Sequence, residues 1–380
     1  MLTTLSFGSY RSLKDLWIPL SSLTVITGPN GSGKSNIFRA LGLLKSAANG
    51  RFAEAIAQEG GMPGVLFAGP DDNRFAREFT EGGPRSSKIT LRLGLAFEDF
   101  RFELNAGLPP QVPGDTSLFT REPDIKSELL FVGKRRPSAM LLERKNSVVY
   151  QGSGAQKTTL CESLASSQSL LSQLTDGLRF PELVNLRQRI LSMRLYQEFR
   201  CDALAPVRSI QIGYRTPILA DDGGNLASAI ATILEQGNAE AFNASIENAF
   251  PGGKISVDRD ERGAFHLSLH QHGLLRGLSV AELSDGTLRF LCLLSALHST
   301  SNTMLMAFNE PEASLHPDLI RPLARQLTLT SKSTQILVMT HSQALANALE
   351  DFSESATLVL ERSFGATKIT GQGLLNTPTF

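Results

Sequence analysis

The sequence lacks the features that would mark a secreted or a membrane protein. Its 37 basic and 37 acidic residues cancel, so no overall charge draws it to nucleic acid or to a membrane surface. The apolar stretch LRFLCLLSAL is short and contains Arg289, so it cannot cross a bilayer. The cysteines are few, odd in number and far apart, as expected of reduced thiols in the cytoplasm: Cys161, Cys201 and Cys292.

Other signals are missing as well. The first twenty residues have no positively charged segment followed by an apolar one, so we expect no secretory signal. There is no internal repeat, no C-x-x-C zinc hook and no long heptad run, which argues against a long coiled coil. What remains is a chain of 380 residues, 41% hydrophobic and 19% charged, with the composition of a globular protein of about two to three domains.

The pattern of apolar residues predicts an α/β protein. Leu23–Thr27 (LTVIT) is typical of a buried parallel strand, and a helix is expected from about residue 36 to residue 45. Alternation over residues 88–106 predicts an antiparallel hairpin. Residues 160–250 are predicted to be helical, with Pro181 at a first helical position. The last third alternates strands with helices, which predicts a parallel sheet.

One motif points directly to chemistry. GPNGSGKS, residues 28–35, fits G-x-x-x-x-G-K-[ST] between a predicted strand and a predicted helix, which is the context that a phosphate-binding loop requires. Backbone N–H groups and the helix N-terminus would face phosphate oxygens. Lys34 would reach the β- and γ-phosphates, and the Ser35 hydroxyl would bind Mg²⁺. The predicted nucleotide contacts of this loop are Asn30, Gly31, Ser32, Gly33, Lys34, Ser35 and Asn36.

Three later segments resemble motifs of ABC-type ATPases and follow their order. Ser284-Asp285-Gly286-Thr287 resembles the signature motif, FNEPEASLHP resembles the Walker B segment with its D-loop, and VMTHS resembles the strand that ends at the switch histidine. The signature lies far from the phosphate loop and close to Walker B, as in that class. Within it, the chain resembles the soluble RecF/SMC-like and OLD-like predicted ATPases over roughly residues 1–106 and 254–361.

This resemblance implies an α/β P-loop ATPase head with an antiparallel β subdomain and an inserted helical lobe. The head would consist of residues 1–106 and 254–380, and residues 107–253 would form the inserted lobe. ATP and Mg²⁺ are the implied cofactors. The class also implies an ATP-dependent homodimer, in which two subunits sandwich two nucleotides head to tail. Ser284 and Gly286 would then contact the nucleotide of the partner.

The same resemblance assigns catalytic roles. Glu310 would be the general base that orients the attacking water, and His341 would contact the γ-phosphate together with Lys34. Asn309 occupies the place of the Walker B aspartate, where it keeps a carbonyl acceptor for the metal but carries no charge. We therefore expect slow turnover and a raised Mg²⁺ requirement. Asp285 replaces a glycine of the signature, and a carboxylate there is unfavourable near phosphate unless it points away.

Alternatives to the hydrolase are a nucleotide-dependent dimeric scaffold with negligible turnover and the ATPase subunit of a transporter. The transporter is disfavoured because the N-terminal strands lack an evident aromatic residue to stack on adenine. No nuclease domain like that of OLD proteins is expected after His341. Gln58 is one candidate for the Q-loop, and a solvated residue at a helix end is the other interpretation.

The expected partners rest on analogy. DNA could be bound through a local basic patch formed by GKRRP, residues 133–137, with Arg144 and Lys145, and a solvated loop is the competing interpretation. A partner effector protein, as in some genome-maintenance or phage-defence systems, is the other expectation. No membrane contact is expected, and the cytoplasm is the expected location.

Overall fold

The computed structural model describes residues 1–69, 89–110, 116–133, 136–152, 157–353 and 355–372. The chain forms two compact units. The first unit contains residues 1–21, 28–193 and 358–380, and the second contains residues 22–27 and 194–357. The predicted boundaries at residues 106 and 253 fall inside these units, so the predicted lobe is divided between them. None of the described helices is long and apolar enough to cross a membrane.

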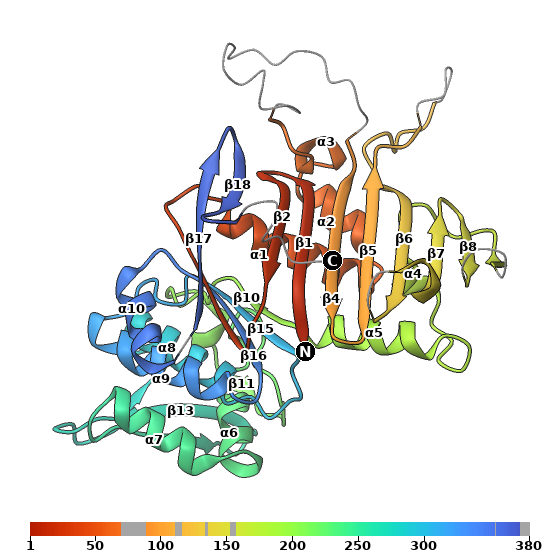
Figure 1. Cartoon of the computed structure of the whole chain (residues 1–380). Coiled ribbons are helices and arrows are strands. Elements are labelled where there is room, and N and C mark those ends of the chain that lie inside the picture. The colour runs from red at the N-terminus through yellow and green to blue at the C-terminus, as the bar shows by residue number, and fades with distance from the viewer. Residues whose placement is uncertain (70–88, 111–115, 134–135, 153–156, 354, 373–380) are drawn as a thin grey trace. The chain divides into compact units, whose positions relative to one another are not determined.

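An antiparallel sheet dominates the first unit (Figure 1). Its described strands lie in the order β2-β1-β4-β5-β6-β7-β8-β9, and each neighbouring pair is antiparallel. The hairpin predicted at residues 88–106 is confirmed as β4 and β5. The strands are β1 (Leu2–Tyr10), β2 (Leu13–Pro19), β4 (Leu91–Phe97), β5 (Phe100–Gly107), β6 (Asp124–Val132), β7 (Met140–Lys145), β8 (Val148–Gln151) and β9 (Thr158–Cys161). A separate antiparallel hairpin consists of β17 (Ala356–Ser363), in this unit from Leu358 onward, and β18 (Ala366–Ile369).

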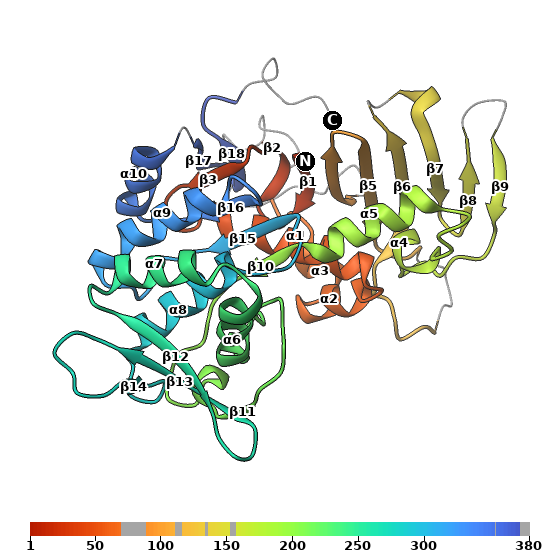
Figure 2. The same ribbon diagram turned by 90° about the horizontal axis from the view of Figure 1, so that it is seen from below.

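Helices α1, α2, α4 and α5 cover one face of this sheet (Figure 2). Helix α5 begins with Pro181 in its first turn and buries Leu183, Leu186 and Ile190, as the sequence pattern predicts. It packs on α1, where the Arg187 Nε donates to the carbonyl of Ala48 at 2.9 Å. The helices are α1 (Lys34–Ala48), α2 (Phe52–Gln58), α3 (Met62–Val65), α4 (Leu170–Gln173) and α5 (Pro181–Ser192), with a 3₁₀ turn η2 at Pro137–Ala139.

A parallel sheet forms the centre of the second unit, with described strands in the order β10-β15-β16-β3. β16 is buried along its whole length, and in β3 and β15 only the last residue is not, which explains their uninterrupted apolar sequences. The strands are β3 (Leu23–Thr27), β10 (Arg194–Tyr196), β15 (Leu305–Asn309) and β16 (Gln335–Met339). The connecting helices are α8 (Asp285–Leu297), α9 (Ile320–Thr330) and α10 (Gln343–Phe352), with a 3₁₀ turn η5 at Pro317–Leu319.

A small antiparallel sheet and two further helices complete the second unit. Its described strands lie in the order β11-β13-β12, and β14 also pairs with β13. One apolar core joins all these layers, with Ile230 of α6, Phe242 of α7 and Phe290 of α8 all buried in it. The elements are β11 (Gln211–Ile212), β12 (Lys254–Arg259), β13 (Ala264–His270), β14 (Leu278–Ser279), α6 (Leu226–Gln236) and α7 (Ala239–Ala249).

The prediction of helix over residues 160–250 is wrong for residues 160–169, 174–180 and 193–225. Between β10 and α6 the chain is irregular apart from η4 (Pro206–Arg208) and β11. Pro206 and Pro217 have no amide hydrogen for a helix, and the glycines of this stretch favour turns. The side chain of Asn225 replaces part of the missing backbone bonding, because it accepts from the Ala220 amide at 2.7 Å.

Candidate functional site

The predicted phosphate loop lies in the first unit, immediately before α1. Gly28, Gly31 and Gly33 have φ angles of 152°, 78° and 111°, a region that side chains other than glycine rarely adopt. A Cβ on Gly33 would come within 2.1 Å of the Thr367 hydroxyl, and one on Gly28 within 2.7 Å of the Leu360 carbonyl. The backbone thus favours glycine at all three positions, and the β17–β18 hairpin also leaves no room for a side chain at Gly28 and Gly33.

A series of linked side-chain hydrogen bonds supports this loop. The amide of Asn36 donates to the Ser12 hydroxyl at 2.9 Å, and the Ser12 and Thr367 hydroxyls are 2.7 Å apart. Thr367 in turn donates to the backbone carbonyl of Ser32 at 2.7 Å. Asn36, predicted to contact nucleotide, therefore supports the loop. Sequence reasoning missed Ser12 and Thr367, because they lie far from the motif along the chain and carry no local signal.

The polar groups of the loop are arranged for an anion. Lys34 is buried, and its Nζ donates to the carbonyls of Gly28 and Pro29 at 2.6 and 3.1 Å, so the ammonium lies against the loop. Asn30 and Ser35 are exposed at the same turn. The N-terminus of α1 adds backbone N–H groups and the positive end of its dipole. This half of the site can bind phosphate through backbone and cation together.

Two of the three predicted catalytic residues, Glu310 and His341, meet at one edge of the parallel sheet in the second unit, whereas Lys34 lies in the first unit. β15 and β16 are parallel neighbours in register from Leu305 to Asn309, so the residues that follow them emerge side by side. The Glu310 amide donates to the Met339 carbonyl at 2.7 Å. The Nδ1 of His341 lies 3.5 Å from the Glu310 Oε1. The structure therefore brings together the predicted base and the predicted switch histidine. Glu310 has a φ of 49°, an uncommon backbone conformation that is frequent at functional sites.

Asn309, at the end of β15, presents a buried amide oxygen with no partner among the described residues. Such an acceptor costs free energy unless a donor or a cation satisfies it. The described residues include no group of three or more His, Cys, Asp or Glu arranged for a metal. Mg²⁺ suits this chemistry, because it is commonly bound by few protein oxygens together with waters and substrate phosphates. Asn309 therefore fits a metal-facing role without a carboxylate cage.

The predicted signature turn begins α8. Ser284 caps this helix, and its Oγ accepts from the Thr287 amide at 3.2 Å. A Cβ on Gly286 would come within 2.6 Å of the Ser314 carbonyl, so the turn packs directly on the loop that follows Glu310. Ser314 has a φ of 63°, which shows that this loop is also tightly constrained.

Arg208 neutralises the unusual carboxylate of this turn. Its Nη2 lies 2.6 Å from the Asp285 Oδ1 and donates to the Leu283 carbonyl at 3.0 Å. Its Nη1 donates to the Val280 carbonyl at 2.6 Å, and its Nε to the Cys201 carbonyl at 2.9 Å. One largely buried guanidinium thus holds several backbone carbonyls of the segment that leads into α8. The sequence offered no signal for Arg208, which belongs to no motif.

Arg289 connects α8 with the candidate base. This buried residue donates from Nη2 to the backbone carbonyl of Glu310 at 3.1 Å, and its Nη1 lies 3.9 Å from the Glu198 Oε1. The strained backbone of Glu310 is therefore held from both sides, by Arg289 and by Met339 of β16. Arg289 was noted in the sequence only as an interruption of an apolar stretch.

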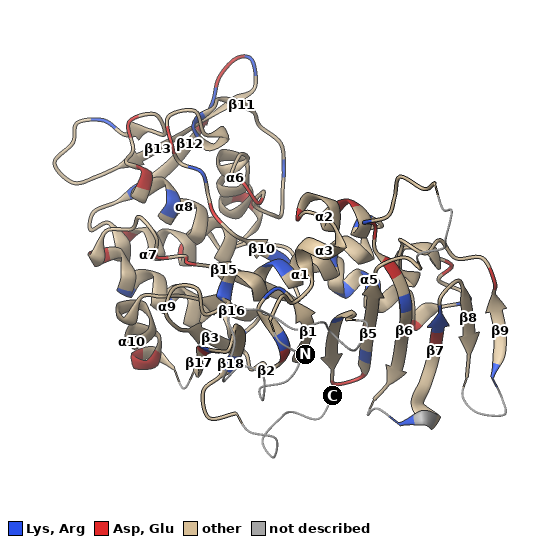
Figure 3. Cartoon of the chain, turned by 90° about the horizontal axis from the view of Figure 1, so that it is seen from above, with Lys and Arg blue, Asp and Glu red and all other residues tan. Residues whose placement is uncertain are grey.

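The predicted basic patch is not formed as expected. Arg144 is fully buried in the first unit, with its Nη1 3.0 Å from the Glu128 Oε2 and further bonds to the carbonyls of Ala165 and Gln168. Burial raises the pKa of the Glu128 carboxyl, and Arg144 opposes that shift. Arg144 is therefore structural and cannot contact DNA. Lys134 and Arg135 lie outside the described residues, and Figure 3 shows basic and acidic positions interspersed over both units.

Gln58, the Q-loop candidate, is exposed at the end of α2, where its amide donates to Glu54 at 3.2 Å. This is the environment of a solvated residue at a helix end.

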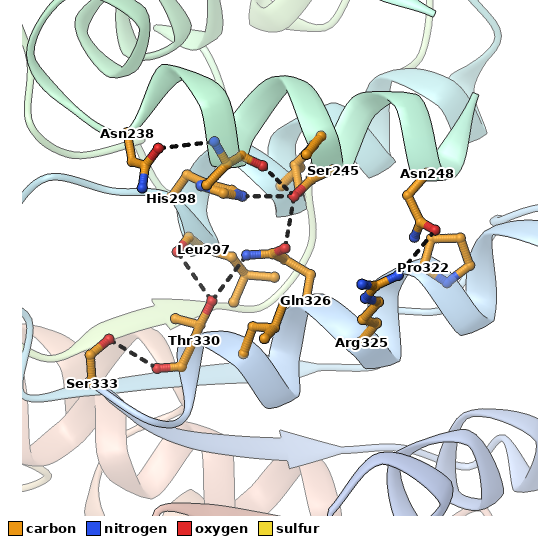
Figure 4. Close-up of a pocket in the computed structure, with 14 residues that line it drawn as sticks. Asn238, Ser245, Asn248, Leu297, His298, Pro322, Arg325, Gln326, Thr330 and Ser333 are labelled. Carbon is orange, nitrogen blue, oxygen red and sulfur yellow. Dashed lines mark hydrogen bonds between the residues drawn. The ribbon is translucent and has the colours of Figure 1, made fainter. Parts of the chain in front are cut away.

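A hollow of about 530 Å³ in the second unit lies away from the predicted residues, among α7, α8 and α9 (Figure 4). The Ser245 hydroxyl lies at its centre, 3.2 Å from the His298 Nε2 and 2.9 Å from the Gln326 Oε1. Burial lowers the pKa of His298 to about 4, and its contact with Gln326 opposes that shift. None of the residues predicted for nucleotide, metal or catalysis lines this hollow.

Comparisons with known proteins bear on the family of the chain. The sequence matches the family described as "AAA domain, putative AbiEii toxin, Type IV TA system" over residues 23–143 and 164–347. A segment of 44 residues is 48% identical to the OLD nuclease of Thermus scotoductus, and it covers 12% of this chain and 8% of that nuclease.

Solved structures agree on the fold. An Smc head bound to the C-winged helix domain of ScpA shares 13% identity at a TM-score of 0.53, over 99% of both chains. An Smc head from Pyrococcus furiosus, bound to the C-terminal domain of ScpA, shares 13% identity at a TM-score of 0.51, over 98% of this chain and 96% of that one. The predicted P-loop ATPase head fold is confirmed.

Proposed function

The chain belongs to the AAA-domain family described as putative AbiEii toxin, Type IV TA system, and on that premise we propose that it binds Mg-ATP and hydrolyses it slowly. The predicted class, an ABC/SMC-like ATPase, is confirmed by this membership and by the fold. The observation that carries hydrolysis, beyond binding, is the pairing of Glu310 with His341 at 3.5 Å beside the buried end of β15.

Each half of the site would perform a different task. The phosphate loop and Lys34 would bind the β- and γ-phosphates and neutralise their charge. Glu310, whose side chain is one-third exposed, would accept a hydrogen bond from the attacking water and orient it. His341 is half-exposed beside it and would donate to the γ-phosphate. The carbonyl of Glu310 is occupied by Arg289, so its backbone would keep one geometry during the reaction.

Each unit offers one oxygen for Mg²⁺: the Ser35 hydroxyl in the first unit and, directly or through water, the Asn309 amide oxygen in the second. When bound, the ion supplies positive charge to the phosphate oxygens. An amide oxygen binds a metal more weakly than a carboxylate does, so a raised Mg²⁺ requirement and slow turnover follow.

A dimer is the second part of the proposal. Ser284, Gly286 and the N-terminus of α8 form an anion-binding turn at the surface of the second unit. The pairing of Asp285 with Arg208 offsets part of the negative charge that would repel a phosphate. In a head-to-tail homodimer this turn would close on the nucleotide of the partner, and hydrolysis would open the dimer. The alternative, a nucleotide-dependent dimeric scaffold without turnover, would bind ATP and dimerise in the same way. It differs from this proposal only because Glu310 and His341 would have no catalytic role.

The output of the cycle is proposed from the relatives. The family description names a putative toxin of a Type IV TA system, and two Smc heads bind domains of ScpA. These support coupling to a partner effector protein, in genome maintenance or phage defence, more than direct contact with DNA. The burial of Arg144 weakens the DNA alternative, because it removes one cation from the predicted patch.

Steady-state phosphate release decides between hydrolase and scaffold. Wild type should release phosphate under saturating Mg-ATP, and Glu310→Gln should lower kcat at least about 100-fold while still binding ATP. A matched control is Glu350→Gln, an exposed carboxyl on α10 that should leave the rate unchanged. If wild type and Glu310→Gln were equally inactive while both bound ATP, the scaffold would replace the hydrolase.

A further inference from the structure

Glu312 is a buried carboxyl beside the candidate catalytic pair, and no motif in the sequence assigned it a role. Only 6% of its side chain is exposed. The Thr340 hydroxyl donates to its Oε1 at 2.5 Å, while its Oε2 is buried with no partner among the described residues. A buried carboxyl that is only half satisfied costs free energy, so stability of the fold alone does not account for it.

The bonded oxygen of Glu312 also faces the imidazole of His341. The Nδ1 of His341 lies 3.7 Å from the Glu312 Oε1 and 3.5 Å from the Glu310 Oε1. The ring therefore lies near two carboxyls that differ in exposure. Glu310 is one-third exposed, whereas Glu312 is buried and fixed by Thr340. Glu312 is the partner that can fix the direction of the ring.

Thr340 makes this arrangement rigid. Its amide donates to the Ile26 carbonyl at 3.0 Å, which ties it to β3. Its hydroxyl accepts from the Ser342 amide at 2.9 Å while it donates to Glu312. The backbone is thus anchored on both sides of His341, and only the side chain of His341 remains to be oriented. With nearly half of that side chain exposed, packing alone cannot orient it.

We propose that Glu312 is a positioning residue, which holds the His341 imidazole beside Glu310 in the orientation that the γ-phosphate requires. The proposal rests on the proposed ATP hydrolysis and deepens it, because it separates the two glutamates of the segment NEPE by role. Glu310 would orient the water, and Glu312 would orient the histidine. Glu312 itself would touch neither the nucleotide nor the water.

The first measurement needs no nucleotide. The chain has only six histidines, so ¹⁵N-histidine labelling gives a simple NMR spectrum in which His341→Asn identifies the His341 ring signals. Glu312→Gln keeps an acceptor for Thr340 and the side-chain volume but removes the carboxylate. We expect this variant to shift the His341 ring signals and leave those of the other histidines in place. Unchanged His341 signals in a folded Glu312→Gln protein would overturn the proposal.

The second measurement separates positioning from folding. Glu312→Gln should lower kcat by about tenfold or more with little change in the KM for ATP, since loss of one positioned donor to a developing charge costs about 10²–10³-fold and this change displaces such a donor. Thr340→Val should give the same kcat loss, and Thr340→Ser, which retains the hydroxyl, should recover most of the rate. A normal kcat in Glu312→Gln would also overturn the proposal. An inactive wild type would remove the proposed function, and the NMR signals would still decide whether Glu312 holds the ring.

Discussion

The phosphate loop of the first unit and the Glu310 edge of the second unit are fixed by different kinds of groups. Apart from its own Lys34, the loop is held by neutral hydroxyls and amides, in the series of hydrogen bonds that runs from Asn36 through Ser12 and Thr367 to the Ser32 carbonyl. The edge is held by ionisable side chains, with Arg289 on the Glu310 carbonyl and Glu312 on Thr340. Because phosphate is itself charged, neutral supporting side chains add no charge that would compete with the loop's own contacts to phosphate. The Glu310 edge must orient a water and a histidine, and charged neighbours can hold such groups in one orientation.

This difference predicts that nucleotide binding by the phosphate loop depends on a single cation, Lys34. Lys34 donates to carbonyls of its own loop, so its loss should damage binding more than folding. We expect Lys34→Ala to lower turnover at least about 100-fold, comparable to loss of a charge-stabilising donor. Phosphate release and ATP titration would measure this. Arg39→Ala, an exposed cation on the same helix, is the control, and an equal loss there would point to damage to α1 instead.

In the phosphate loop, we expect substitutions of glycine to be most destabilising where the β17–β18 hairpin packs against the loop. Gly33→Ala combines an unfavourable φ with a contact of 2.1 Å to the Thr367 hydroxyl, whereas Gly31→Ala has the unfavourable φ and open space. We expect Gly33→Ala to lower the free energy of unfolding by about 3 kcal/mol and Gly31→Ala by about 1 kcal/mol. Urea denaturation of both variants compares them directly. Equal losses would mean that Thr367 does not restrain the loop.

In the second unit, we expect removal of Arg208 to weaken the proposed dimer. Arg208→Met leaves Asp285 unpaired at the signature turn and frees the carbonyls that Arg208 holds. In a Glu310→Gln background with ATP, we expect the dimer dissociation constant to rise about tenfold, since one partner of a charge pair remains. Arg215→Met, an exposed cation elsewhere in the second unit, should leave it unchanged. Sedimentation measures both.

A further substitution sharpens this result. If Arg208 acts by neutralising Asp285, then Arg208→Met combined with Asp285→Gly should dimerise better than Arg208→Met alone. If the double variant stayed as weak as the single one, the carbonyl contacts of Arg208 would carry its effect. An unchanged dissociation constant in Arg208→Met itself would show that this arginine has no part in dimer closure.

The two halves also differ in what the sequence could predict. The phosphate loop, α1 and the buried strands of the parallel sheet follow from local patterns, because glycine spacing and apolar runs are read within a few residues. Glu310 and His341 were found through motif resemblance, and the structure brings them to adjacent strand ends. The supporting residues Ser12, Thr367, Arg208 and Glu312 were not found. Each acts through a partner distant in sequence, and a lone serine or arginine carries no periodic signal.

Arg144 shows the opposite error. Its neighbours made it one member of a basic cluster, and the structure buries it against Glu128. A cation on a strand looks the same in sequence whether it faces solvent or a buried carboxyl, because its partner is set by the pairing of β6 with β7. The irregular stretch 197–225 was mispredicted for a related reason, since side chains such as Asn225 supply hydrogen bonds that propensity does not count.

The smallest effect is expected at Asn309, the proposed Mg²⁺ ligand of the second unit. Asn309→Asp adds a carboxylate where a buried amide oxygen now lacks a partner. A charged ligand adds about 1–3 kcal/mol over a neutral one, so the Mg²⁺ concentration for half-maximal phosphate release should fall about fivefold or more. Asn309→Leu is the control of similar volume, and it should raise that concentration instead. If the Mg²⁺ dependence were unchanged in both variants, residue 309 would not face the metal, and the neutral character of the Walker B position would have no bearing on slow turnover.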